Sequence, residues 1–96
     1  MPQSEALTKT KPFVPKLYNV ILHNDDVTTM DFVVDVIVTI FNKNFDDAVA
    51  LMLKIHESGL AICGVYEKEI AKSKQQSVLK AAKVAGFPLK CSIELE

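Results

Sequence analysis

Hydrophobic and polar positions alternate strictly in two stretches of this chain, near its start and at its end. From Lys16 to His23 the side chains of Tyr18, Val20 and Leu22 fall on one side, and residues 89–96 repeat the same period of two. The short apolar run 60–66 is typical of a buried strand. The pattern therefore predicts three strands, of which two are the first and last elements.

A helical period separates the first two predicted strands. Residues 30–41 are almost all apolar and many are β-branched, which on propensity alone could indicate a strand. Asp31, Asp35 and Thr39 recur at a spacing of four, however, and so form one polar stripe on a helix. We therefore expect a helix that is buried on most of its circumference, with Thr28 as its N-cap.

Two further helices follow from the same reasoning. From Phe45 to Glu57 or Ser58 the apolar residues share one face, on which His56 lies one turn beyond Met52. Residues 67–85 have an inner face that includes Val78 and Ala85, with lysines such as Lys74 outside. This last helix is expected to be mostly solvated.

The order β-α-α-β-α-β predicts a single α+β domain. Its three-stranded, mainly antiparallel sheet should be covered on one face by three helices. The other face should be wet, because Lys90, Ser92 and Glu94 alternate with apolar residues in the last strand. Residues 1–15 lack apolar periodicity and are expected to form a flexible N-terminal extension, and residues 16–96 the folded core.

Charge and composition narrow the function classes. The 96 residues carry 11 Lys and Arg against 12 Asp and Glu, so the positive field that attracts nucleic acid is missing. No apolar run approaches the ~20 residues that span a bilayer, and we expect a cytoplasmic protein. Cys63 and Cys91 have no CxxC partner and are interpreted as buried thiols in a reducing compartment.

The candidate chemistry lies where the first strand meets the first helix. Asn24, Asp25 and Asp26 place an amide oxygen and two carboxylates in a row, and His56 adds an imidazole. Such a set of acceptors with negative potential suits an ammonium group. The neighbouring apolar residues that could receive a large side chain are Leu22, Met30, Val33 and Met52. A plain polar turn with a helix cap is the alternative interpretation.

Three other functions compete with ligand binding at this segment. A hydrolase using Cys63, His56 and Asp25 is disfavoured, because nothing indicates an activated thiolate or an oxyanion hole. A zinc site that adds His23 and Cys91 lacks the usual ligand spacings. A structural or ribosome-associated interaction module, in which this set of residues binds no ligand, stays open as the alternative.

Four segments in the same order resemble the ClpS adaptor family. They are Val20–Val33, Leu51–His56, Ala61–Tyr66 and Pro88–Cys91, and the resemblance extends over residues 16–96. It implies the fold shared with the C-terminal domain of the ribosomal stalk protein. It also implies an adaptor without catalytic residues, metal or cofactor, which binds N-degrons and passes them to the N-terminal domain of an AAA+ Clp unfoldase.

The resemblance assigns roles to particular positions. Asn24, Asp26 and His56 would hydrogen-bond the free α-amino group of a protein whose first residue is Leu, Phe, Tyr or Trp. Asp25 would help to fix the beginning of that peptide, and Met30 would exclude β-branched side chains. The positions implied for the hydrophobic pocket are Leu22, Thr28, Met30, Val33, Met52 and Leu89.

Unfoldase docking is implied for three positions on the surface, namely Val27, Glu69 and Lys74. Residues 1–15 would be the segment that the unfoldase engages during delivery. The chain departs from the family pattern where Val27 replaces a common aromatic, where Thr29 stands in place of proline, and where His23 replaces an aliphatic residue.

Overall fold

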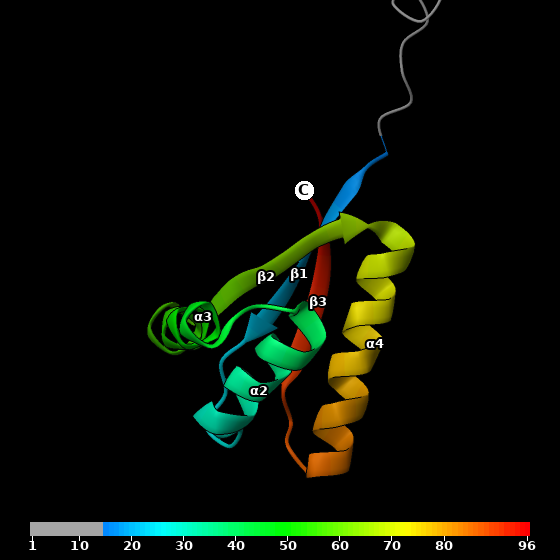
Figure 1. Cartoon of the computed structure of the whole chain (residues 1–96). Helices are drawn as coiled ribbons and strands as arrows, with labels where there is room; N and C mark the ends of the chain where they lie inside the picture. The colour runs from blue at the N-terminus through cyan, green and yellow to red at the C-terminus, as the bar shows by residue number, and fades with distance from the viewer. Residues whose placement is uncertain (1–14) are drawn as a thin grey trace, which may run out of the picture.

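The computed structural model describes residues 15–96 and confirms the predicted element order (Figure 1). The elements are β1 (Leu17–His23), α2 (Met30–Phe41), α3 (Phe45–Ser58), β2 (Leu60–Glu67), α4 (Lys68–Ala85) and β3 (Lys90–Leu95). The predicted N-terminal extension lies outside the described residues except for Pro15. No helix in the described part of the chain is long and apolar enough to cross a membrane.

The sheet is antiparallel throughout, with β1 between β2 and β3. Leu22 lies opposite Ala61 on one side and Cys91 on the other, so these three side chains share a face. Between Val20 and Ile21 the register with β2 shifts. This irregularity leaves Cys63 without an opposite residue in β1 and allows its buried side chain to join the core.

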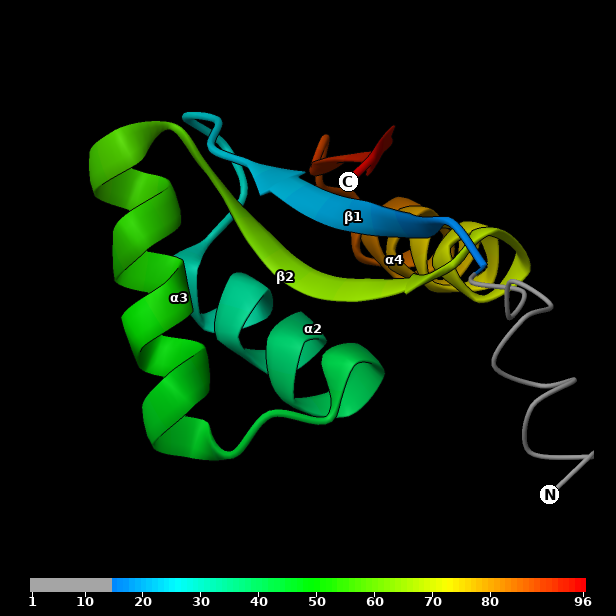
Figure 2. The same cartoon turned by 90° about the horizontal axis from the view of Figure 1, so that it is seen from above.

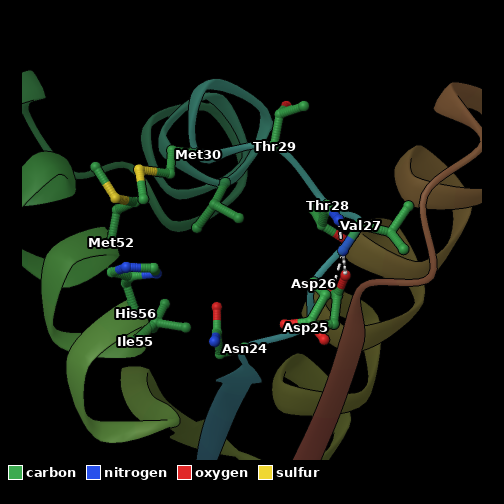
Figure 3. A pocket seen from close by; sticks show the side chains of 11 residues that line it. Asn24, Asp25, Asp26, Val27, Thr28, Thr29, Met30, Met52, Ile55 and His56 are labelled. Carbon is green, nitrogen blue, oxygen red and sulfur yellow. Dashed lines mark hydrogen bonds between the residues drawn. The ribbon is translucent and has the colours of Figure 1, made fainter.

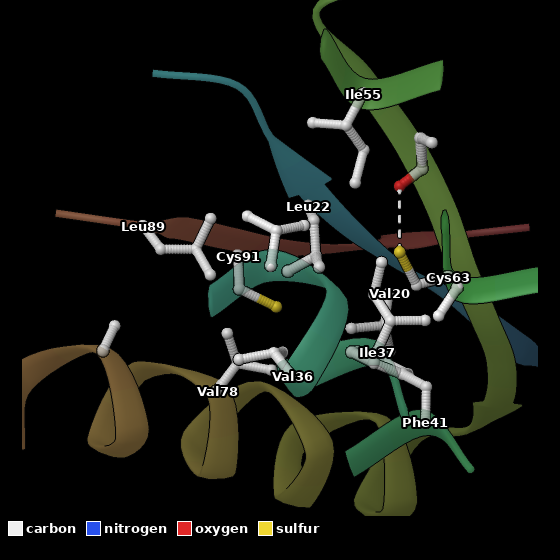
Figure 4. Close-up of a cluster of buried hydrophobic side chains, with 14 of the residues drawn as sticks. Val20, Leu22, Val36, Ile37, Phe41, Ile55, Cys63, Val78, Leu89 and Cys91 are labelled. Atoms are coloured by element: carbon white, nitrogen blue, oxygen red, sulfur yellow. Dashed lines mark hydrogen bonds between the residues drawn. The ribbon is translucent and has the colours of Figure 1, made fainter. Parts of the chain in front are cut away.

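All three helices lie on one face of the sheet, as predicted (Figure 2). Helix α4 contacts all three strands, whereas α3 packs against α2 and β2. The largest of the completely buried side chains lie between the sheet and the helices (Figure 4): Val20, Leu22, Val36, Ile37, Cys63 and Val78. Both cysteines are buried and free, which confirms the interpretation of them as buried thiols.

The N-cap of α2 is Thr29 and not Thr28. The Thr29 hydroxyl accepts a hydrogen bond of 3.2 Å from the Phe32 amide. The prediction of Thr28 was wrong because its hydroxyl donates instead to the carboxylate of Asp25, 2.7 Å away. Since Met30 is the first helical residue, Thr29 stands at the cap itself, where a side-chain oxygen satisfies an otherwise unpaired amide.

Helix α3 is capped by Asn44, whose Oδ1 accepts from the Asp47 amide at 2.8 Å. It ends at Gly59, which adopts a left-handed conformation with a φ of 92°. The carbonyl of Gly59 then accepts a hydrogen bond of 2.8 Å from the amide of Asn24. This bond ties the loop that follows β1 to the end of α3 that carries His56.

Two predictions about exposure need correction. Ala85, expected on the inner face of α4, is exposed at the end of the helix. Lys74, expected outside, is half-buried because its ammonium donates a 2.7 Å hydrogen bond to the carbonyl of Ile40 and lies 5.6 Å from the ring centroid of Tyr66. The lysine therefore joins α4 to the end of α2.

The outer face of the sheet is only partly wet. Lys90 and Glu94 are exposed there, as predicted, and Ser92 accepts or donates a hydrogen bond of 2.7 Å with the His23 ring. Ile21 on the same face is only 4% exposed, and its neighbour Ile62 is apolar too. The alternation of polar and apolar residues in β3 could not reveal this apolar part of the outer face, because its residues come from β1 and β2.

Candidate functional site

The loop between β1 and α2 is held in shape by Asp25. Its Oδ1 accepts hydrogen bonds from the amides of Val27 and Thr28, at 2.8 and 2.6 Å, while its Oδ2 accepts from the Thr28 hydroxyl. Desolvation alone would raise the pKa of Asp25, but these three hydrogen bonds outweigh it and lower the pKa. The carboxylate is therefore anionic and largely committed to the loop.

Asn24 and Asp26, on either side of Asp25, keep their side chains free. Both residues are exposed, and neither side chain has a hydrogen-bond partner among the described residues. His56, in the last turn of α3, is exposed as well. Figure 3 shows His56 and Asn24 at neighbouring edges of an open space, with Asp25 and Asp26 on the other side of Asn24.

This space is a cavity of about 390 Å³ between the loop, the start of α2 and the end of α3. It brings together eight of the residues predicted for substrate binding, which are Asn24, Asp25, Asp26, Thr28, Met30, Val33, Met52 and His56. Val27, Thr29 and Ile55 complete the lining. Ile55 was not among the residues predicted for the pocket, although its spacing of three from Met52 could have indicated it.

Leu22 and Leu89, also predicted for the pocket, do not line it. They are 0% and 3% exposed, respectively, and belong to the core beneath the loop. Both leucines lie next to the loop or the last strand in sequence, but their side chains point between sheet and helices (Figure 4). Their contribution in this structure is to support the site.

The cavity has two chemically different walls. On one wall Met30 and Met52 bring their thioethers side by side (Figure 3), with Val33 and Ile55 completing the apolar surface. On the other wall, the exposed side-chain oxygens of Asn24 and Asp26 can accept hydrogen bonds from a ligand. Such a cavity can hold an amphipathic ligand that has a cationic donor group beside an apolar group.

The positions implied for unfoldase docking are not all on one surface. Glu69 is exposed in the first turn of α4 and lies 3.9 Å from the ammonium of Lys72. Lys74 follows five residues later in α4. Val27 is 62% exposed, but it follows the last residue of β1. The first residue of the strand is the one that pairs with Glu67, next to the start of α4. Val27 and α4 therefore lie at opposite ends of β1. Val27 instead lines the cavity.

The two cysteines considered for catalysis and metal binding lie in the core, apart from Asp25 and His56, which line the cavity. Burial raises the pKa of Cys63 to about 11 and that of Cys91 to about 12, which opposes thiolate formation. In residues 15–96 no group of three or more His, Cys, Asp or Glu side chains could hold a metal ion. His23 is engaged with Ser92 on the outer face of the sheet.

Sequence and structure comparisons agree on what the chain is similar to. Residues 14–92 match the model of the family described as "ATP-dependent Clp protease adaptor protein ClpS". A ClpS adapter protein of Campylobacter jejuni is 52% identical over 96 residues, with both chains covered completely. One from Wolinella succinogenes is 50% identical over 80 residues, which are 83% of this chain and 78% of the relative.

The fold is also that of a solved ClpS structure. Agrobacterium tumefaciens ClpS2, determined bound to L-phenylalaninamide, superposes with a TM-score of 0.83 at 38% identity. The alignment covers 86% of this chain and all of that one. Family model, relatives and solved structure coincide, and the chain therefore belongs to the ClpS family of adaptors for the ATP-dependent Clp protease.

Proposed function

We propose that this chain binds the free α-amino group and the bulky hydrophobic first residue of N-degron proteins, and delivers them to an AAA+ Clp unfoldase. The observation that carries the proposal is the cavity in which exposed acceptors face an apolar wall. A related ClpS2 was solved with L-phenylalaninamide, which itself combines an α-amino group with an aromatic side chain. We assign the same kind of ligand to this cavity.

The α-amino group is held in this proposal by Asn24, Asp26 and His56. An ammonium has three donors and no acceptor, so it matches a carboxylate, an amide oxygen and an unprotonated imidazole nitrogen. Acetylation would remove the charge and most donors. A bound acetylated terminus would bury these acceptors without partners, and each such loss costs about 1–3 kcal/mol. Acetylated termini should therefore be strongly disfavoured.

The first side chain occupies the apolar wall formed by Met30, Val33, Met52 and Ile55. Fully burying a Leu or Phe side chain is worth roughly 1.5–3 kcal/mol relative to leaving it exposed. Alanine and serine side chains bury little apolar surface and gain little of this free energy. Methionine thioethers adapt to branched and aromatic shapes, which is compatible with acceptance of Leu, Phe, Tyr and Trp by one cavity.

Delivery requires a second surface, which we assign to Glu69 at the start of α4. Lys74, the other position assigned there, holds α2 and α4 together through Ile40, and its ammonium is only partly available to a partner. The docking partner in this proposal is the N-terminal domain of the Clp unfoldase. Substrate and unfoldase would then bind at opposite ends of β1 and could be held simultaneously.

The deciding experiment is fluorescence anisotropy with labelled peptides that differ only at the first residue. Peptides that begin with free Leu or Phe should bind, and the same peptides with an acetylated terminus or with alanine in first place should bind far more weakly. Equal affinity for all of them would end the N-degron proposal. It would favour the alternative of a structural interaction module.

A further inference from the structure

Strand β3 forms one edge of the sheet, and in the described part of the chain it pairs with β1 alone (Figure 1). Just after β3, the amide of Glu96 donates a 2.9 Å hydrogen bond to the carbonyl of Leu17 in β1. Opposite residues of antiparallel strands alternate between hydrogen-bonded and non-bonded pairs. The backbone N–H and C=O groups of Cys91, Ile93 and Leu95 therefore point away from β1.

Most of these outward groups have no hydrogen-bond partner within residues 15–96. Gln75 of α4 reaches only the Cys91 carbonyl, to which its Nε2 donates at 2.9 Å. This bond also confirms that the Cys91 carbonyl points away from β1. The N–H and C=O groups of Ile93 and Leu95 remain available. An edge with a row of unpaired backbone groups can accept a further strand.

The other edge of the sheet, β2, is less suited to such pairing. Its ladder with β1 is interrupted where the register shifts between Val20 and Ile21, and irregularities of this kind bend a strand and disturb its edge. Helix α3 also packs against β2. Strand β3 contains no proline and keeps a constant register with β1. The sheet is therefore open to extension on the β3 side.

The charges of β3 are divided between its two ends. Lys90 begins the strand, Glu94 stands near its end, and Glu96 follows it, and all three residues are exposed. A second copy of the strand that runs antiparallel brings each Lys90 to the acidic end of the other strand. A parallel arrangement would instead align like charges, which is unfavourable. The strand is thus complementary to itself in the antiparallel orientation.

We infer that two copies of this chain associate by antiparallel pairing of their β3 strands, with Ile93 opposite Ile93 of the second copy. In this register the outward groups of Ile93 bond to each other, and Cys91 pairs with Leu95. Only the bonds to the Cys91 carbonyl share their acceptor with Gln75. Lys90 lies opposite Glu96 in a non-bonded pair, where facing side chains come closest.

A register centred on Ser92 is less favourable. It would pair Cys91 with Ile93 and use the Cys91 carbonyl, which already accepts from Gln75, in every bonded pair of the two strands. It would also leave Leu95 without an opposite residue in β3. We therefore assign the centre of the contact to Ile93.

The same register covers apolar side chains on the helix side of the sheet. Leu95 is 54% exposed in the single chain and would lie opposite Cys91 of the second copy. Leu79, 37% exposed, follows Gln75 by one turn on the same side of α4, and Gln75 contacts Cys91. Leu79 is thus on the side of α4 that faces Leu95 of the second copy.

The pair would leave both candidate sites open. None of the residues that line the cavity belongs to β3 or α4, which form the contact. A dimer of this kind would therefore present two binding cavities. The inference does not depend on which ligand the cavity takes, because neither measurement described below involves a peptide.

The first test is sedimentation velocity of the full chain over concentrations from about 10 µM to 1 mM, the range in which small, transient contacts are populated. The mass should double as the concentration rises. Leu95→Pro removes an N–H that points away from β1, so the ladder within the single chain is kept. This variant should raise the dissociation constant at least about tenfold. A wild-type chain that stays monomeric throughout would overturn the inference.

Charge reversal tests the register. Lys90→Glu should raise the dissociation constant about tenfold, and Lys90→Glu combined with Glu96→Lys should restore it to within about threefold of wild type. The matched control is Lys54→Glu, which reverses an exposed charge on α3. Restoration by Glu94→Lys in place of Glu96→Lys would overturn the assigned register. A dimer that withstands both Leu95→Pro and Lys90→Glu, or that Lys54→Glu weakens equally, would contradict the inference.

Hydrogen exchange measured by NMR identifies the surface directly. The amide of Ile93 should exchange more slowly as the dimer forms, whereas the amide of Glu94, which points toward β1, should not change. A mass that doubles while the Ile93 amide exchanges as fast as before would assign the contact to another surface and refute the proposal. Circular dichroism of each variant confirms that the comparison is made between folded proteins.

Discussion

The carboxylate of Asp25 accepts hydrogen bonds from both the backbone amide and the hydroxyl of Thr28, at 2.6 and 2.7 Å. These contacts close the turn between β1 and α2 and fix the direction in which the neighbouring side chains leave it. The three consecutive polar residues thus have two different roles. Asp25 stabilises the loop, and Asn24 and Asp26 present free acceptors to the cavity. The role of Asp25 toward the peptide itself stays a prediction.

Replacing Asp25 by asparagine should destabilise the protein by about 1 kcal/mol at pH 7, because hydrogen bonds to a charged acceptor are replaced by weaker ones. Because the pKa of Asp25 is lower in the folded state than its usual value of 3.8, its stabilisation is present above that value and is lost as the pH falls through the folded pKa. Urea unfolding should therefore show a gap between wild type and Asp25→Asn that narrows below about pH 4. A gap independent of pH would contradict this account.

Asp26→Ala should abolish measurable binding of a Leu-first peptide, with a loss of at least about tenfold in affinity, and leave stability within about 0.5 kcal/mol of wild type. The reason is that the Asp26 side chain has no partner among the described residues to lose. Peptide anisotropy and urea unfolding measure the two quantities. Glu94→Ala, which removes another exposed carboxylate, is the control. Undiminished affinity in a folded Asp26→Ala protein would refute the assigned role.

Met30→Ala should widen the range of first residues. Met30 lies at the start of α2 and lines the cavity opposite Asn24 (Figure 3). In the proposed function its side chain limits the space for a branched Cβ. Peptides beginning with Val or Ile should gain affinity relative to Leu by about three- to tenfold. Leu53→Ala is the matched control, since Leu53 and Met30 are both 45% exposed and Leu53 lies outside the cavity. An unchanged ratio would show that Met30 is not the gate.

Lys74→Ala should lower the free energy of unfolding by about 1 kcal/mol, because it removes both the hydrogen bond to Ile40 at the end of α2 and the contact with the Tyr66 ring. Glu69→Ala should change stability little and weaken binding to the unfoldase N-terminal domain. Lys72→Ala, an exposed lysine of the same helix, is the control for charge. Chemical denaturation and calorimetric titration distinguish the two effects. Equal stability of the Lys74 and Lys72 variants would remove the structural role of Lys74.

Much of the fold follows from local sequence. The period of two predicts β1 and β3 to within a residue, and the stripe of Asp31, Asp35 and Thr39 identifies α2 with both its bounds. The cap of α3 is equally local, because the side-chain oxygen of Asn44 accepts from an amide only three residues away. These features depend on neighbours along the chain, and therefore a single sequence contains them. The segment containing Asn24 and Asp26 was found for the same reason.

Contacts between distant segments could not be inferred in this way. Local pattern placed Leu22 in the pocket and the family resemblance placed Leu89 there, but packing of the helices on the sheet encloses both, since burial depends on what covers a side chain. Thr28 was predicted as the cap, but the turn places its hydroxyl against the carboxylate of Asp25. Lys74 looked solvated, although residues 34 positions apart meet at the end of α2. Hydrophobic periodicity and helix capping involve residues only a few positions apart, so the sequence by itself determines them. Whether a polar side chain is hydrogen-bonded or free depends on the partners that tertiary packing brings within hydrogen-bond distance.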